Sequence, residues 1–174
     1  QTENPNLADA DKAKIQDIAV LGEGNNARIY LLDTNQNQIW RFRITGDATI
    51  GLAERWLKSE TSLAEARDIS IDNNIYLLFP DRLERYFNGS KQNFNLSSVT
   101  PAIQNAARVF TDSDLQMIYI LEPEKERILI YNKNGKLENQ LKSAKLRDSA
   151  DFHVDEKNKI IYVGSGTELL QINF

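Results

Sequence analysis

A fourfold repeat of the dipeptide Ile-Tyr constrains the fold of this chain more than any other feature of its sequence. The first copy begins at Ile29, and the next three follow at intervals of 46, 43 and 43 residues. The copies are Ile29-Tyr30, Ile75-Tyr76, Ile118-Tyr119 and Ile161-Tyr162. A period of about 40–45 residues is typical of a unit built from four short strands. The chain is therefore predicted to consist of a few copies of one small structural unit.

Each Ile-Tyr pair lies within a series of short apolar segments that repeats with it. A strand-like segment precedes each pair, at Asp17–Val20, Asp68–Ile71, Arg108–Thr111 and Asp151–Val154. A third segment follows each pair, at Gln38–Phe42, Arg82–Phe87, Arg127–Tyr131 and Glu168–Phe174. A fourth, more polar strand is expected around Trp56-Leu57, at Asn93–Leu96 and at Leu137–Leu141, whereas the last unit ends with its third. Residues that favour hairpin turns, such as Asp72-Asn73-Asn74, separate the segments.

These segments predict an all-β fold made of four-stranded antiparallel meanders. Ile, Val, Tyr and Phe suit a pleated, half-buried surface, but a single meander cannot cover both of its own faces. Radial stacking as blades of a β-propeller buries each face against a neighbouring blade. We therefore expect about four blades, in units near residues 15–58, 66–97, 106–143 and 149–174, after an N-terminal extension or linker at residues 1–14.

Alternation within the second strands predicts the core. Side chains two positions apart on a strand share one face, so the Ile of each pair and the residue two positions later are expected to be buried together. These residues are Ile29, Leu31, Ile75, Leu77, Ile118, Ile120, Ile161 and Val163.

The passage from the second to the third strand resembles the NHL repeat. The segments IYLLDTNQNQIWRF at residues 29–42 and IYILEPEKERILIYNKNGKL at residues 118–137 carry this resemblance, which extends over about residues 16–174. It implies an NHL-like β-propeller. It implies little about function, because one fold supports many functions.

A narrower resemblance is to the C-terminal half of extracytoplasmic propeller proteins of candidate-phylum bacteria, and residues 68–96 and 107–131 carry it. It implies further blades upstream, a membrane anchor before them and a location outside the cytoplasm, secreted or membrane-anchored. The missing initiator Met before Gln1 agrees with a processed or truncated product. We therefore expect that the chain does not close a ring alone and belongs to a propeller of six blades or so. The alternative is a four-bladed ring in which residues 1–14 pair beside the last strand.

Charge and composition argue against several classes of function. The net charge is −4 and both signs are interspersed along the chain, so a nucleic-acid partner is not expected. The chain has no cysteine and one histidine, His153. It therefore has no thiolate nucleophile and cannot supply a histidine cluster for a metal. We expect no metal, no cofactor and no enzymatic activity, with a membrane involved only through an upstream anchor.

One set of charged residues occupies an equivalent position in all four units. Asp17, Asp68, Arg108 and Asp151 each begin the innermost strand of a predicted blade. Their side chains are candidates for a ring that faces the central channel and binds a cation or polar ligand. The alternative, which an arginine among three aspartates favours, is local charge pairing and bonding to neighbouring backbone.

The resulting expectation is a non-catalytic binding or scaffolding module that presents a rigid propeller surface to a protein or polar ligand. Propeller loops converge at the rims and the central opening of a stiff scaffold, which is where partners bind. Two alternatives stay open. One is a structural subunit that associates with itself through unclosed blade edges, forming an oligomer or fibre. The other is a lyase or hydrolase centred on the channel.

Overall fold

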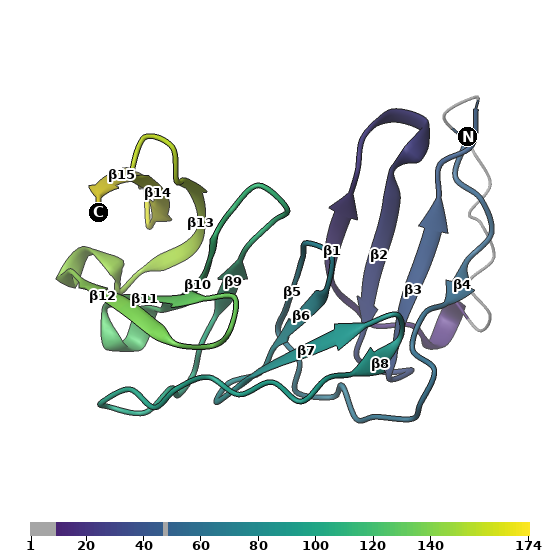
Figure 1. Ribbon diagram of the computed structural model, residues 1–174, viewed down its shortest axis with the longest axis horizontal. Helices are drawn as coiled ribbons and strands as arrows, with labels where there is room; N and C mark the ends of the chain where they lie inside the picture. The colour runs from purple at the N-terminus through teal and green to yellow at the C-terminus, as the bar shows by residue number, and fades with distance from the viewer. Residues whose placement is uncertain (1–9, 47–48) are drawn as a thin grey trace.

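Four antiparallel sheets form an all-β structure in the computed structural model, which describes residues 10–46 and 49–174 (Figure 1). The first sheet, blade 1, contains β1 (Ile15–Leu21), β2 (Arg28–Asp33), β3 (Gln38–Arg43) and β4 (Glu54–Arg55). Blade 2 contains β5 (Asp68–Ile71), β6 (Ile75–Leu78), β7 (Leu83–Phe87) and β8 (Ser90–Lys91). Blade 3 contains β9 (Arg108–Phe110), β10 (Met117–Glu122), β11 (Arg127–Asn132) and β12 (Leu137–Lys142). Blade 4 contains β13 (Ser149–Asp155), β14 (Ile160–Ser165) and β15 (Glu168–Asn173).

The remaining regular elements of the described residues are short 3-10 turns. They are η1 (Ala10–Lys12), η2 (Gly24–Asn26), η3 (Pro123–Lys125) and η4 (Ala144–Leu146). The predicted extension at residues 1–14 lies, for residues 1–9, outside the described residues.

The strands follow one another in chain order within each sheet, which is the meander predicted from the repeat. The tyrosine of every Ile-Tyr pair occupies the same register position, opposite the third residue of the repeated innermost segment. The pairs are Tyr30 with Ala19, Tyr76 with Ser70, Tyr119 with Phe110, and Tyr162 with His153. The predicted all-β fold of propeller blades is confirmed.

The apolar core consists of three layers, each between two consecutive blades. Side chains of blades 1 and 2 form one layer, those of blades 2 and 3 the next, and those of blades 3 and 4 the third. The segments between blades contribute to these layers, since Leu63 is buried in the first, Ala106 in the second and Leu146 in the third. Stacking of blades therefore buries the sheet faces, as the segment pattern predicted.

One expectation about the fourth strands is wrong. In blade 1 the fourth strand lies in the expected region around Trp56-Leu57, as β4, and ends at Arg55. In blade 2 the strand β8 is Ser90–Lys91, whereas Asn93–Leu96 forms no strand. Both strands are two residues long and polar, so no apolar alternation marks them. The expected strand at Leu137–Leu141 is present as β12.

The core prediction is correct for the second strands of blades 2, 3 and 4 and wrong for blade 1. Ile75, Leu77, Ile118, Ile120, Ile161 and Val163 are buried. Ile29 and Leu31 are only half-buried, because they lie on the face of β2 that points away from blade 2. Ile18 and Val20 lie on the same face of the neighbouring strand β1 and are each 55% exposed.

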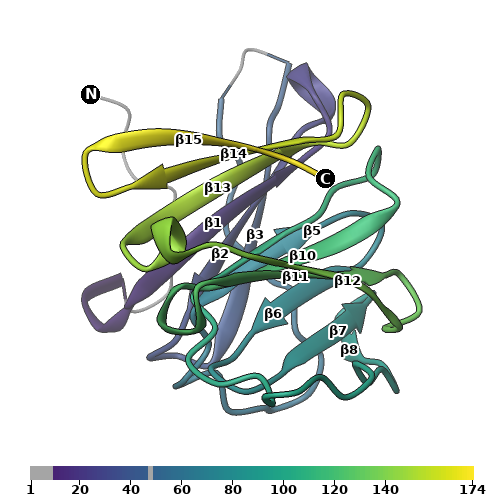
Figure 2. The same ribbon diagram turned by 90° about the vertical axis from the view of Figure 1, so that its left-hand side faces the viewer.

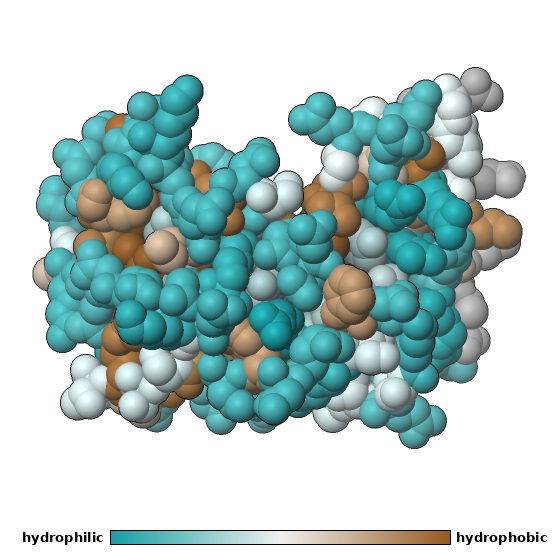
Figure 3. Space-filling model, in the orientation of Figure 1, coloured by the Kyte–Doolittle hydropathy of each residue, from teal (hydrophilic) through white to brown (hydrophobic). Residues whose placement is uncertain are grey.

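The blades are arranged as an arc with blade 1 and blade 4 at its ends (Figures 1 and 2). Figure 3 shows a notch between these ends at the top of the view. In blade 4 the strand β15 pairs with β14 alone among the described residues. The described part of the chain thus leaves one face of blade 1 and one face of blade 4 without a neighbouring blade.

Candidate functional site

All four residues of the predicted charged ring line one hollow at the centre of the arc. This cavity has a volume of about 410 Å³ and is bounded by the innermost strands β1, β5 and β9, with Asp151 of β13 at its edge. Asp17, Asp68 and Arg108 contribute to its wall. The position shared by these residues in the sequence repeat thus brings them together in space.

Asp17 and Asp68 join consecutive blades through the backbone. The Oδ2 atom of Asp17 accepts a hydrogen bond of 2.9 Å from the backbone N–H of Ile69. The Oδ2 atom of Asp68 accepts one of 2.6 Å from the backbone N–H of Val109. In both cases the aspartate binds the residue that follows the equivalent position in the next blade. We call this bond the inter-blade latch.

Arg108 replaces the aspartate of the repeat in blade 3 and lies between two carboxylates. Its Nε atom is 3.9 Å from Oδ1 of Asp68 and 3.8 Å from Oδ1 of Asp151. Asp151 accepts a hydrogen bond of 2.8 Å from the backbone N–H of its neighbour Phe152, and its side chain is 76% exposed. The arginine thus lies between carboxyl groups of blades 2 and 4.

The environment of Asp68 favours its neutral form. The pKa of the Asp68 carboxyl is raised to about 9, first by burial and then by the hydrogen bond and negative charge of Asp17, while the Val109 amide and Arg108 act in the opposite direction. A carboxyl with that pKa keeps its proton at neutral pH. The ring therefore carries fewer negative charges than its sequence indicates.

The sequence gives no sign of a second group of contacts, which involves Ser70 and Lys133. The Oγ atom of Ser70 donates to the carbonyl oxygen of Thr111 at 2.7 Å and accepts from its N–H at 2.9 Å. Lys133 of blade 3 extends toward blade 2, where its Nζ atom is 2.8 Å from Oδ2 of Asp72 and also contacts Oγ1 of Thr111. No spacing in the sequence indicates the bonds of Ser70 to Thr111 or of Lys133 to Asp72, because each joins segments of different blades.

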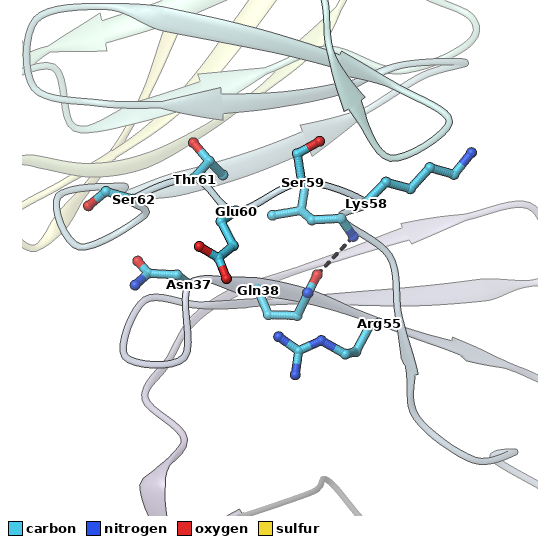
Figure 4. A pocket seen from close by; sticks show the side chains of 9 residues that line it. Asn37, Gln38, Arg55, Lys58, Ser59, Glu60, Thr61 and Ser62 are labelled. Atoms are coloured by element: carbon cyan, nitrogen blue, oxygen red, sulfur yellow. Dashed lines mark hydrogen bonds between the residues drawn. The ribbon is translucent and has the colours of Figure 1, made fainter.

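A polar groove of about 540 Å³ lies beside the segment that connects blades 1 and 2 (Figure 4). We call residues 56–67, together with the corresponding residues 92–107 between blades 2 and 3, the crossover loops. Figure 4 shows the Glu60 and Arg55 side chains directed toward Gln38, while Lys58 points away. Asn37 of the β2–β3 turn closes one end of the groove.

Buried hydrogen bonds fix the walls of this groove. The Oε1 atom of Gln38 accepts from the backbone N–H groups of Ile39 at 2.9 Å and Leu57 at 2.8 Å. The Oδ1 atom of Asn37 accepts from the backbone N–H of Leu63 at 2.7 Å. Gln38 and Leu63 are both buried. A crossover loop without regular structure is thus held at two points on the edge of blade 1.

The second crossover loop is held by a buried ion pair. Arg127 and Glu122 both have fully buried side chains, and the guanidinium nitrogen is 2.6 Å from Oε2 of Glu122. The Nη2 atom of Arg127 also donates to the carbonyl oxygen of Pro101 at 2.8 Å, and Oε1 of Glu122 accepts from the backbone N–H of Gln104 at 2.8 Å. Both crossover loops therefore have a defined conformation.

The described residues contain no group of three or more His, Cys, Asp or Glu side chains that could hold a metal ion. In the same part of the chain, no helix has the length and apolar character needed to cross a bilayer.

Comparison with known proteins supports the fold. The sequence matches no protein-family profile and no curated protein. Among solved structures, a nidogen–laminin complex matches with a TM-score of 0.61 and 15% identity, over 88% of this chain and 57% of that one. Virginiamycin B lyase from Staphylococcus aureus matches with a TM-score of 0.59 and 14% identity, over 97% of this chain and 58% of that one.

A third similar structure is the extracellular domain of a one-component system candidate from B. thetaiotaomicron. Its TM-score is 0.60 at 14% identity, and the match covers 97% of this chain and 22% of that one. At these identities the likeness shows the fold alone. The neighbours are β-propeller proteins, and this chain spans just over half the length of the first two.

Proposed function

We propose that this chain is a non-catalytic binding module whose crossover loops present a preformed polar groove to a segment of a protein partner. The observation that carries the proposal is the fixed polar groove beside residues 56–67, with Glu60 and Arg55 directed into it. Loops held on a rigid scaffold are where binding residues concentrate. A preformed surface also lowers the entropy cost of association.

The charges of the groove indicate the chemistry of the partner. Arg55 supplies a cation, its guanidinium carbon lying 5.5 Å from the centre of the Trp40 ring, and Glu60 supplies an anion. Ser59, Thr61 and Ser62 add hydroxyl groups around them. An extended peptide with charges of both signs matches this lining.

The chemistry of the central cavity favours binding over catalysis in this proposal. Asp17 and Asp68 accept backbone hydrogen bonds between blades, which is a structural use of those carboxylates. The only histidine, His153, is not among the residues that line the cavity, although its ring centroid lies 4.9 Å from that of Phe110, which is. Acid–base catalysis by the lining residues themselves would therefore have to proceed without histidine.

The proposal includes an NHL-like repeat, a bacterial source and a location outside the cytoplasm, either secreted or membrane-anchored. The resemblances carried by residues 29–42, 68–96 and 107–137 support these points. The similar structure from B. thetaiotaomicron, an extracellular domain, agrees with the location.

Selection from a phage-displayed library of random peptides on the immobilised chain tests the binding function. We expect the enriched peptides to carry both acidic and basic residues and to bind saturably in calorimetry. The charge exchanges Arg55→Glu and Glu60→Lys should each weaken binding about tenfold, because each replaces an attraction with a repulsion. Lys157→Glu, in the β13–β14 turn, is the matched control and should leave affinity unchanged.

Two results would contradict the proposal. One is peptide binding that is equally sensitive to Lys157→Glu and to the two groove variants. The other is turnover of lactone, ester or lyase substrates that disappears in Asp151→Asn or His153→Ala, because that result would make the central opening a catalytic centre.

A further inference from the structure

Every blade has two chemically different faces, and the repeat defines which is which. The face that carries the tyrosine of the Ile-Tyr pair, the leading face, points to the next blade. The face that carries the isoleucine, the trailing face, points to the preceding blade. Tyr30 thus packs in one cluster with Ile75, and Tyr119 packs in another with Ile161.

The two ends of the arc expose one face of each kind. No blade of the described residues covers the trailing face of blade 1, which is apolar, and Ile18 and Val20 on it are each 55% exposed. No described blade covers the leading face of blade 4 either, and His153 on it is exposed. Tyr162 is only half-buried there, whereas its three counterparts, Tyr30, Tyr76 and Tyr119, are at most 5% exposed.

The same ends carry the two halves of one inter-blade latch. Asp151, whose side chain is 76% exposed, occupies the acceptor position that Asp17 and Asp68 use. The donor position belongs to Ile18. Ile18 pairs with Leu31 in blade 1, as the latch donor Ile69 pairs with the equivalent Leu77 in blade 2. Since antiparallel pairs alternate in the direction of their N–H groups, the amide of Ile18 points away from β2.

We propose that the trailing face of blade 1 binds the leading face of blade 4 in a second copy of this chain. A twofold axis through the central opening then forms two such junctions at once, and two copies complete one ring. At each junction Asp151 of one copy accepts a hydrogen bond from the Ile18 amide of the other. The central cavity is closed by residues of both copies.

Two observations favour a second copy as the occupant. The chain itself contains both complementary faces and both halves of the latch, so a closed twofold interface needs no other component. Each junction continues an interface that already occurs three times within the chain.

The geometry of the existing interfaces also predicts which side chains meet. Ser70 of blade 2 contacts Thr111 of blade 3. His153 occupies the position of Ser70 in blade 4, and Val20 occupies the position of Thr111 in blade 1. His153 of one copy is therefore expected to face Val20 of the other.

Light scattering coupled to size-exclusion chromatography, with native mass spectrometry over a dilution series, tests the proposal. The wild-type chain should have twice the mass of a monomer. Val20→Lys should be monomeric, because it places a charge in an apolar interface. Phe87→Lys is the control, because Phe87 has a similar exposure of 54% but belongs to blade 2, away from the trailing face of blade 1 and the leading face of blade 4. This variant should remain dimeric. Asp151→Ala should raise the dissociation constant about tenfold or more, since each dimer loses two latches.

A charge-compensated variant identifies the register of the junction. His153→Glu combined with Val20→Lys should restore the dimer that Val20→Lys alone abolishes, provided that circular dichroism shows both proteins folded. A wild-type chain that is monomeric throughout the dilution series would overturn the proposal and leave these faces to other blades of a longer polypeptide. A dimer insensitive to Val20→Lys would also overturn it, because the interface would then lie elsewhere.

Discussion

At the scale of single residues, equivalent positions of the repeat make the same contact where they hold the same residue and a different contact where the residue differs. Asp17 and Asp68 make the same bond to the next blade at 2.9 and 2.6 Å. Arg108 cannot accept such a bond and instead lies between two carboxylates. The position of all three could be predicted from the sequence. The bonds could not, because the acceptor and the donor belong to different units of the repeat.

The raised pKa of Asp68 gives a pH dependence of stability with a definite sign. The carboxyl has a pKa of 3.8 when unperturbed and about 9 in the folded chain. Between these values only the folded chain keeps the proton, so its free energy of unfolding falls as pH rises through that window. Asp68→Asn cannot lose a proton. Its denaturant midpoint should therefore fall less than that of the wild type between about pH 4 and pH 9.

Asp81→Asn is the control for this prediction, because the Asp81 side chain is 66% exposed. The denaturant midpoint of Asp81→Asn should change with pH in the same way as that of the wild type. Parallel curves for the wild type and Asp68→Asn would show that Asp68 is ionised in the folded chain.

The buried pair of Arg127 and Glu122 provides a second prediction at this scale. Arg127→Leu leaves the buried carboxylate of Glu122 without its main partner and should lower the free energy of unfolding by about 3–5 kcal/mol. Urea denaturation measures this change. The double variant Arg127→Leu and Glu122→Leu should lose less than Arg127→Leu alone, and a larger loss in the double variant would contradict the assignment.

At the scale of elements, long apolar strands could be predicted and short polar ones could not. The innermost, second and third strands contain the alternating residues that bury against neighbouring blades. The outermost strands β4 and β8 have two residues each, and backbone pairing with β3 and β7 defines them. The groove could not be predicted from the sequence for a related reason. Its walls are fixed by backbone groups that lie 19 residues from Gln38 and 26 residues from Asn37.

Core packing between blades can be tested in β10. Ile118 is fully buried between blades 2 and 3, so Ile118→Ala should lower the free energy of unfolding by about 2–5 kcal/mol in chemical denaturation. Phe87→Ala removes an apolar side chain that is 54% exposed and should change the free energy of unfolding by no more than about 0.5 kcal/mol. Equal losses from the two substitutions would mean that the face assignment of β10 is wrong.

The β11–β12 turn offers a test of how the second crossover loop is fixed. Gly135 has a φ of +84°, and a Cβ atom there would lie 2.3 Å from the carbonyl oxygen of Asn95. Gly135→Ala should therefore displace residues 92–107 and speed their cleavage by chymotrypsin at Phe94 or Leu96 in limited proteolysis. Gly166→Ala, at a positive φ with open space around it, should not alter cleavage of that loop.

At the scale of the whole molecule, stacking of equivalent blades explains both the core and the exposed ends. Ile29 and Leu31 were predicted to be buried because their counterparts in other units are buried. They are half-buried because burial depends on a preceding blade, and the position of a unit within an array is not encoded in its own strand pattern. The charged opening could be predicted from the repeat, whereas the groove between blades 1 and 2 depends on the path of a loop.

Amide hydrogen exchange by NMR tests most directly the claim that equivalent latches join blade 1 to blade 2, blade 2 to blade 3, and blade 4 to blade 1 of a second copy. The amides of Ile69 and Val109, which donate to Asp17 and Asp68, should exchange slowly in the wild type and in Val20→Lys alike. The amide of Ile18 should be protected in the wild type and exchange rapidly in Val20→Lys. Exchange of Ile69 and Val109 as fast as that of loop amides would contradict the account, because the blades would then not be latched.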